Sequence, residues 1–84
     1  MTKSYKDIIG DTSANTAKLR KGIPDVMQGF NAMAQAAGKA GVLDEKTKEL
    51  IAMALSVAAR CDPCIGYHAK ALVKFGAIRA EVEE

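Results

Sequence analysis

The stretch that decides the fold runs from Glu49 to Ala77 and reads ELIAMALSVAARCDPCIGYHAKALVKFGA. Apolar residues recur through its first half at the spacing of a helix. Those on one face are Leu50, Ile51, Ala54, Val57 and Ala58. Met53 and Leu55 extend the apolar surface beyond that face, and Asp44 is placed to cap the helix. The sequence therefore predicts a helix over about 45–60, buried in a bundle or in a subunit interface.

A break and a second helix follow at the motif CDPC of residues 61–64. Proline cannot continue a helix, so the first helix is expected to end here. Asp62 can cap the next helix, with Pro63 at its first position. This second helix is predicted to run to about residue 75, where Gly76 provides the C-terminal stop.

The remainder of the chain is also helical in character, because Ala, Lys, Glu, Leu and Met dominate and strand patterns are rare. A weak helix is expected over about 3–21, interrupted at Gly10. Another is expected to begin at Pro24 and to end near Gly38. The segment 77–84 reads as the first turns of a further helix, so we expect the folding unit to be incomplete at its C-terminus. The fold class predicted is all-α.

The composition describes one small domain over residues 1–84, with little material for a core. Hydrophobic residues make up 49% of the chain, but 15 residues are Ala, Trp is absent, and Phe and Tyr together number four. Because Ala buries little apolar area, a chain of this size is marginally stable alone. We therefore expect a homo-oligomer, or further chain, to complete the core.

Charge and hydropathy argue against several classes of protein. The net charge is +2, and the basic residues are scattered without interleaved aromatics, so no nucleic-acid partner is expected. No apolar run approaches the roughly 20 residues of a membrane helix, and residues 1–10 lack the apolar core of a secretory signal. Two cysteines are too few for a disulfide scaffold, so a cytoplasmic location is expected, with no membrane association.

The strongest chemical signal is the group formed by Cys61, Cys64 and His68. Cys64 falls in the first turn of the second helix, where free N–H groups and the positive helix end stabilise a thiolate. Arg60 adds a nearby cation. His68 lies four residues further on the same helical face, so its imidazole can accept the thiol proton. Cys61 can close a disulfide with Cys64, which is the arrangement of an attacking and a resolving thiol.

Other interpretations of these residues stay open. Cys61, Cys64 and His68 would supply three zinc ligands where a structural site needs four, and a c-type haem needs His where Ile65 stands. We therefore predict no metal and no cofactor. Glu49 taken alone is an ordinary solvated glutamate, and it reaches His68 only if the two helices cross suitably.

The pattern as a whole resembles the AhpD-like alkylhydroperoxidase / carboxymuconolactone decarboxylase family. The residues that carry the resemblance are Glu49, Cys61-x-x-Cys64-x-x-x-His68 and Gly76-Ala77, preceded by Leu43-Asp44-x-x-x-x-Glu49-Leu50-Ile51-Ala52-x-Ala54. It covers about 24–84 and leaves 1–23 as an N-terminal helical extension. It implies an AhpD-like helical bundle in which an antiparallel helix pair carries the CxxC motif, assembled as trimers or hexamers.

The resemblance also implies roles for the candidate catalytic residues. Cys64 would attack the peroxide O–O bond, and Cys61 would resolve the product to a disulfide and face the reductant. His68 would assist deprotonation of Cys64, with Glu49 polarising His68. Members that decarboxylate muconolactones generally lack the Cys pair, so the predicted function is reduction of hydroperoxides by a thiol or dithiol reductant. The alternatives are a decarboxylase-like lyase without a redox role, and a metal-binding or redox-sensing oligomeric module.

Overall fold

Helices account for the architecture of residues 3–84, which the computed structural model describes. They are α1 (Tyr5–Gly22), α2 (Pro24–Gly38), α3 (Glu45–Ala58), α4 (Asp62–Lys74) and α5 (Arg79–Glu83). No strand occurs within these residues, which confirms the all-α prediction. Nor does any helix in this part of the chain combine the length and apolar character needed to cross a bilayer.

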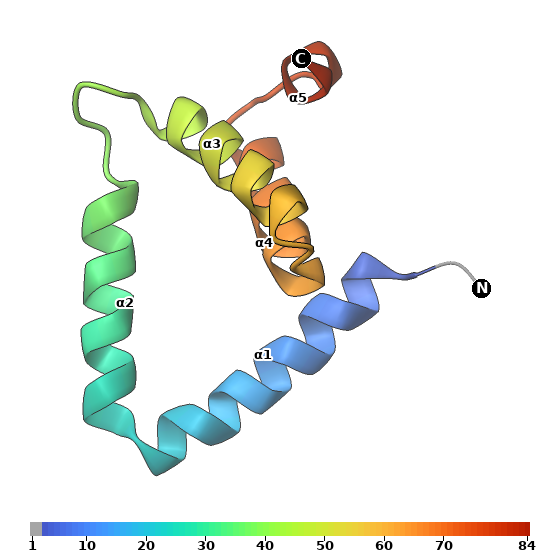
Figure 1. The fold of residues 1–84 in the computed structure, drawn as a ribbon. Helices are drawn as coiled ribbons and strands as arrows, with labels where there is room; N and C mark the ends of the chain where they lie inside the picture. Colours follow the sequence, from blue (N-terminus) through green and yellow to red (C-terminus); the bar gives the residue numbers. More distant parts are fainter. Residues whose placement is uncertain (1–2) are drawn as a thin grey trace.

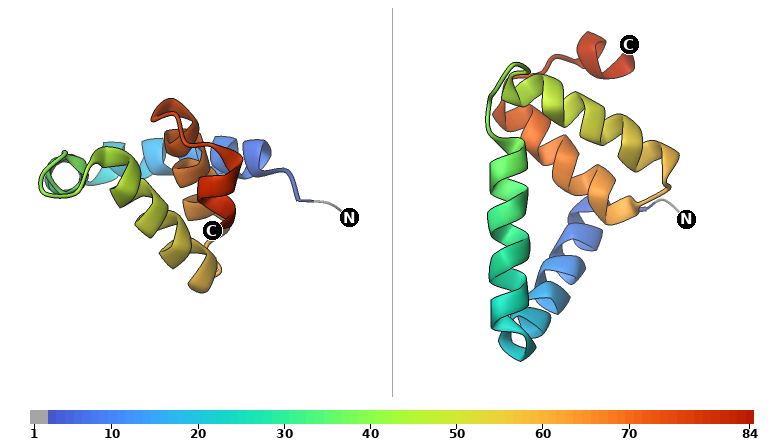
Figure 2. Two further views of the ribbon diagram at one scale, coloured as in Figure 1. Left: turned by 90° about the horizontal axis from the view of Figure 1, so that it is seen from above. Right: turned by 60° about the vertical axis from the view of Figure 1, so that its left-hand side comes forward.

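The helices form an open frame rather than a filled bundle (Figure 1). α3 and α4 run antiparallel and side by side, and the N-terminal part of α1 packs against α4. α2 stands apart as a separate side of the frame and meets its neighbours mainly at its two ends, as both views in Figure 2 show. The short α5 lies at the far end of the α3–α4 pair.

Local sequence signals explain most of the helix ends. The Asp44 carboxylate caps α3 by accepting the N–H of Thr47 at 2.7 Å, and Pro24 begins α2, both as predicted. Ser4 caps α1 through the N–H of Asp7. The predicted interruption at Gly10 is wrong, because α1 continues unbroken through it.

The α3–α4 connection is a Schellman turn. The Arg60 N–H donates to Val57 O and the Cys61 N–H donates to Ser56 O, at 3.1 Å each. This turn ends α3 at Ala58, two residues earlier than predicted, and it holds Arg60 at φ 56°, in the left-handed region that glycine favours. A second Schellman turn ends α4, where Gly76 has φ 76° and acts as the predicted stop.

The core of this frame is very small. Met27 and Leu72 are the buried hydrophobic residues of the described chain, with Ser56 as a buried polar one. The accessible surface is 6601 Å², whereas a compact monomer of this mass exposes about 4,800 Å². The radius of gyration of 14.0 Å likewise exceeds the roughly 12 Å expected for the chain length. The weak core inferred from composition is therefore a feature of the fold.

Two lysines of α3 bind neighbouring elements, one at the end of α2 and one on α5. The Lys48 ammonium donates to the carbonyls of Ala37 and Lys39, at the C-terminal end of α2 where helix carbonyls lack partners. Lys46 pairs with Glu81 of α5 at 2.7 Å. This hydrogen-bonded pairing raises the pKa of Lys46 and lowers the pKa of Glu81.

The α1–α4 contact depends on close approach at Gly66. A Cβ built on Gly66 would lie 2.7 Å from Cγ1 and 2.8 Å from Cδ1 of Ile9, both well inside contact distance. One turn along α1, the hydroxyls of Ser13 and Tyr67 form a hydrogen bond of 2.5 Å. Lys3 adds an ion pair with Asp62 at 2.9 Å. The first half of α1 is thereby held along the helix that carries the motif.

Gly66→Ala should therefore be less stable than a matched Gly10→Ala variant. Each substitution should gain about 1 kcal/mol of stability from the higher helix propensity of alanine. At Gly10 nothing lies within 4 Å of the added Cβ, so this gain is unopposed. At Gly66 the crowding against Ile9 should cost about 1–3 kcal/mol. Urea unfolding at one protein concentration measures the difference. Ile9→Ala should cost less stability in the Gly66→Ala background than in the wild type, and equal costs would show that this contact does not limit the packing.

Candidate active site

Helix pairing brings Glu49 and His68 together. Glu49 lies nine residues before the end of α3, and His68 lies six residues after the start of α4. At 1.5 Å per residue these distances differ by about 4.5 Å, which a glutamate side chain can span. The structure shows the contact directly, with 2.6 Å between Nδ1 of His68 and Oε2 of Glu49. Both side chains are partly exposed, His68 at 33% and Glu49 at 21%.

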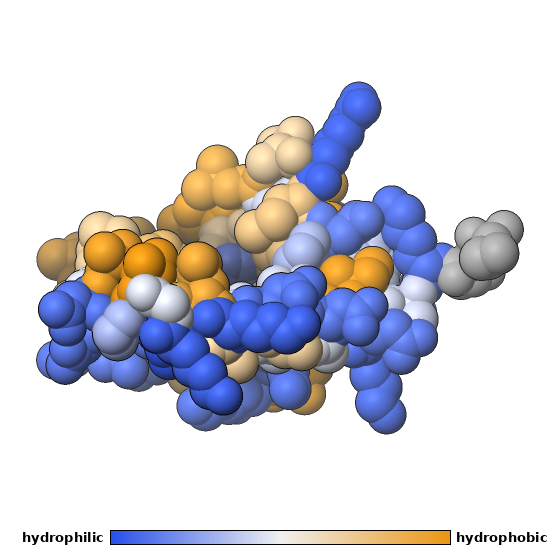
Figure 3. Space-filling model, turned by 90° about the horizontal axis from the view of Figure 1, so that it is seen from below, coloured by the Kyte–Doolittle hydropathy of each residue, from blue (hydrophilic) through white to orange (hydrophobic). Residues whose placement is uncertain are grey.

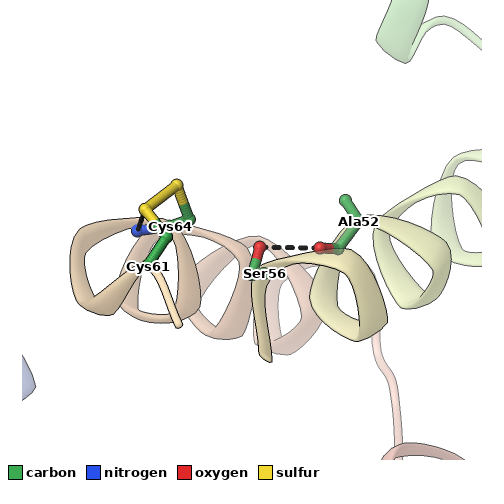
Figure 4. The surroundings of a disulfide bond; sticks show 4 residues. All are labelled: Ala52, Ser56, Cys61 and Cys64. Carbon is green, nitrogen blue, oxygen red and sulfur yellow. Dashed lines mark hydrogen bonds between the residues drawn. A yellow bond between two sulfur atoms is a disulfide. The ribbon is translucent and has the colours of Figure 1, made fainter. Parts of the chain in front are cut away.

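Cys61 and Cys64 form a disulfide at the start of α4, with Cα atoms 5.2 Å apart. Figure 4 shows this bond beside the end of α3, where the buried Ser56 hydroxyl donates to the carbonyl of Ala52. The backbone carbonyl of Ser56 also accepts the N–H of Cys61. Ser56 thus anchors the first cysteine through its main chain, a role that sequence pattern does not signal.

The cap of α4 is Cys61, so the prediction that Asp62 caps this helix is wrong. The Schellman turn leaves Cys61 in an extended conformation (φ −96°, ψ 96°), and its sulfur accepts the N–H of Cys64 at 3.3 Å. Asp62 is the first helical residue, and its carboxylate pairs with Lys3. Cys64 is consequently the third residue of α4 rather than the second.

In this geometry both sulfurs lie near the positive N-terminus of α4, which favours the thiolate form of each cysteine. Cys64 still lies in the first turn, near the positive end of the helix, and Cys61 additionally accepts a backbone N–H. His68 lies one turn beyond Cys64. Within residues 3–84, its hydrogen bond is to Glu49, and none joins it to either sulfur of the disulfide.

Two cavities flank these residues. One of about 330 Å³ lies between α2 and α3, borders Glu49 and His68, and has Ala34, Ala37, Ile51 and Leu55 in its walls. The other, of about 620 Å³, lies between α1, α2 and α4 and borders Cys64 and Tyr67. Ala71 and Phe75, which continue the helical face of Cys64 and His68, line neither cavity.

The described residues do not form a metal centre of the common kind. No group of three or more His, Cys, Asp or Glu side chains within 3–84 is placed to hold a metal ion. The arrangement instead combines a thiol pair that forms a disulfide with a neighbouring carboxylate–imidazole pair. Such a constellation can perform thiol–disulfide exchange and proton transfer.

Sequence comparison identifies the family to which this fold belongs. The sequence pattern of the carboxymuconolactone decarboxylase family matches residues 24–84. The chain belongs to the carboxymuconolactone decarboxylase family. Members of this family are generally enzymes. The segment 1–23, which contains all of α1, lies outside the matched residues.

Similar proteins occur in several bacteria. A crystal structure of the apo form of a carboxymuconolactone decarboxylase family protein from Legionella pneumophila superimposes with a TM-score of 0.91 at 52% identity, over 94% of this chain and 70% of that one. An uncharacterized protein of Haemophilus influenzae is 40% identical over 83% of this chain, and the chain spans 62% of that protein's length. An uncharacterized protein of Cupriavidus necator is 31% identical over the whole chain and 74% of its own.

The N-cap geometry predicts an unusually reactive Cys61 in the reduced protein. In a Cys64→Ser variant, the N–H that the Cys61 sulfur accepts is retained, so the folded protein should stabilise the Cys61 thiolate more than the unfolded chain does. Alkylation by iodoacetamide at pH 7 should be several-fold faster in the folded variant than in the same variant in urea. Equal rates would show that the cap does not stabilise the thiolate. The Cys61→Ser variant, measured in parallel, gives the alkylation rate of Cys64.

Proposed function

We propose that the protein is a thiol-dependent peroxidase and disulfide oxidoreductase that reduces hydroperoxides through Cys61 and Cys64. The observation that carries the proposal is the Cys61–Cys64 disulfide at the start of α4, one turn from the hydrogen-bonded His68–Glu49 pair. The two cysteines supply a redox couple, and His68 supplies a proton carrier on the same helix pair. The decarboxylase branch of the family's chemistry does not require a disulfide.

The first half of the cycle consumes the peroxide. His68, oriented by Glu49, accepts the proton of the Cys64 thiol. The Cys64 thiolate attacks the terminal oxygen of ROOH, so that an S–O bond forms, the O–O bond breaks and the alkoxide leaves. The alkoxide takes the proton from His68 and departs as ROH, leaving Cys64 as a sulfenic acid.

The second half restores the thiols. The Cys61 thiolate, stabilised by the N–H of Cys64, attacks the sulfenic sulfur and releases hydroxide, which is protonated to water. The product is the disulfide that the structure contains. An external thiol or dithiol reductant then reduces it by exchange, and a reducing compartment such as the cytoplasm would provide one.

A second candidate function is a lyase that acts on a lactone acid without redox chemistry. The observation in its favour is the cavity beside Glu49 and His68, which is lined chiefly by small and apolar side chains and which neither cysteine borders. There, Glu49 and His68 would perform acid–base catalysis. This function would be independent of the Cys pair.

Removal of single cysteines should separate the steps. Cys64→Ser should reduce dithiol-dependent consumption of an organic hydroperoxide to the rate in buffer, because the attacking sulfur is lost. Without a thiol reductant, Cys61→Ser should consume one peroxide per chain and then stop, because Cys64 remains a sulfenic acid. His68→Gln should lower the rate by about 10²-fold or more, as expected for loss of a proton-transfer group.

The peroxidase assignment fails if Cys64→Ser retains wild-type consumption. Activity on a lactone acid that survives in the Cys61→Ala/Cys64→Ala double variant would establish the lyase instead. Free-thiol counts before and after peroxide provide the direct readout, with a reversible loss of two thiols per chain expected for the peroxidase.

We further propose that the functional form is a homo-oligomer, a trimer or a hexamer. The surface exceeds that of a compact monomer by about 1,800 Å², more than twice the roughly 800 Å² that each partner contributes to a standard interface. On α2, Val26, Phe30 and Met33 share one face and are 56–64% exposed. Figure 3 shows apolar patches left open on the lower face of the frame.

Sedimentation should therefore give a particle of three or six times the 8.9 kDa chain mass. Val26→Glu/Met33→Glu should dissociate it, because it places two charges on the apolar face of α2. Gln28→Glu/Gln35→Glu adds the same charge at the same spacing on the opposite face and should leave the mass unchanged. A monomeric wild-type protein at micromolar concentration would contradict the oligomer.

A further inference from the structure

The cavity beside Cys64 has a wall that the family-matched segment does not supply. This wall is the inward face of α1, which lies before the matched residues 24–84. It contributes Thr12, Ser13, Thr16 and Arg20, opposite Cys64 and Tyr67 of α4. Phe30, Asn31 and Pro63 complete the lining. The volume of about 620 Å³ falls within the range of small-molecule sites.

The character of the α1 face changes along its length. Near its start, Ile9 packs against Gly66 and closes the α1–α4 contact. In the following turns the same side of the helix contributes the hydroxyl residues Thr12, Ser13 and Thr16, and then Arg20, to the cavity lining. A helix face that only packs against its neighbours is apolar, whereas polar groups converging on a cavity fix the orientation of a ligand.

The only charge in the cavity lining is positive. Arg20 is the single charged residue of its lining, and no carboxylate borders it. A guanidinium binds carboxylates through two parallel hydrogen bonds, and the α1 hydroxyls can bind further polar atoms. The lining therefore favours an anionic ligand over a neutral or cationic one.

The register of α1 places Arg20 about two turns beyond the point where α1 contacts α4. The Ser13 hydroxyl is hydrogen-bonded to the Tyr67 hydroxyl, three residues beyond Cys64 on α4. Arg20 lies seven residues further along α1, which corresponds to about 10.5 Å. A ligand that reaches Cys64 with one end and Arg20 with the other is thus an elongated molecule.

We propose that this cavity binds the peroxide substrate of Cys64, and that this substrate is an elongated organic hydroperoxide bearing a carboxylate that Arg20 binds. The proposal rests on the peroxidase function, which identifies the group that reacts at Cys64. It makes α1, the helix outside the family-matched segment, the element that determines substrate specificity. Arg20 is a binding residue here and takes no part in cleavage of the O–O bond.

The activity test compares a medium-chain fatty acid hydroperoxide with its methyl ester, which differs only in the charge of the distal group. The wild type should prefer the acid by about 10-fold or more in kcat/KM, as expected for one charge-assisted pairing. Arg20→Gln should remove this preference by lowering the value for the acid alone, and Arg20→Lys should restore part of it. Lys18→Gln removes a cation from the opposite face of α1 and should retain the preference.

A binding test separates failure of this proposal from failure of the peroxidase function. In the reduced Cys61→Ser variant, octanoate should slow alkylation of Cys64 by iodoacetamide, and the neutral octanamide should not. Adding Arg20→Gln should abolish the protection, while adding Lys18→Gln should keep it.

Consumption of neither hydroperoxide by the wild type, with protection by octanoate intact, would overturn the peroxidase function but support the anion site. Equal consumption of acid and ester, with no protection by octanoate, would overturn the anion site and leave the peroxidase function standing.

Discussion

The rest of the structure depends on the Schellman turn between α3 and α4. Its two hydrogen bonds, from Arg60 to Val57 and from Cys61 to Ser56, use the last carbonyls of α3 and reverse the chain within three residues. The reversal makes α3 and α4 antiparallel neighbours and brings Glu49 to His68. It also leaves Cys61 extended, so that its sulfur caps α4. Arg60 in the left-handed region is the local cost of this geometry, about 1–3 kcal/mol for a residue other than glycine.

The fold could be predicted from the sequence wherever the signals are local. Asp44, Pro24 and Gly76 each act at the helix end at which they stand, and the structure shows all three in those roles. The prediction for Asp62 failed because capping preference was weighed without the preceding turn, whose hydrogen bonds place Cys61 at the cap. The predicted interruption at Gly10 failed for a different reason. One glycine destabilises a helix by only about 1 kcal/mol, which is too little to break an 18-residue helix.

The site could be predicted from the sequence only where its parts lie close together along the chain. Cys61, Cys64 and His68 sit within two turns, so helical spacing alone relates them. Contact between Glu49 and His68 requires the helix pairing, and the spacing left it undecided. The α1 wall of the Cys64 cavity lies more than 40 residues from Cys64, and its hydroxyls have the pattern of a solvated helix face. Only the close approach of Ile9 to Gly66 reveals that this face is turned inward.

The open frame connects the weak core to the chemistry. Small side chains on α3 and α4 allow these helices to lie close enough for direct contact between Glu49 and His68, but they bury little apolar area. A filled core would have covered the start of α4, whereas here the Cys pair remains half-exposed and two cavities reach its neighbours. A thiol pair that must meet both a peroxide and a reductant needs such access. Association through the exposed face of α2 would supply the missing apolar burial, and because Phe30 of that face also lines the Cys64 cavity, the interface would border that cavity opposite the wall that α1 provides.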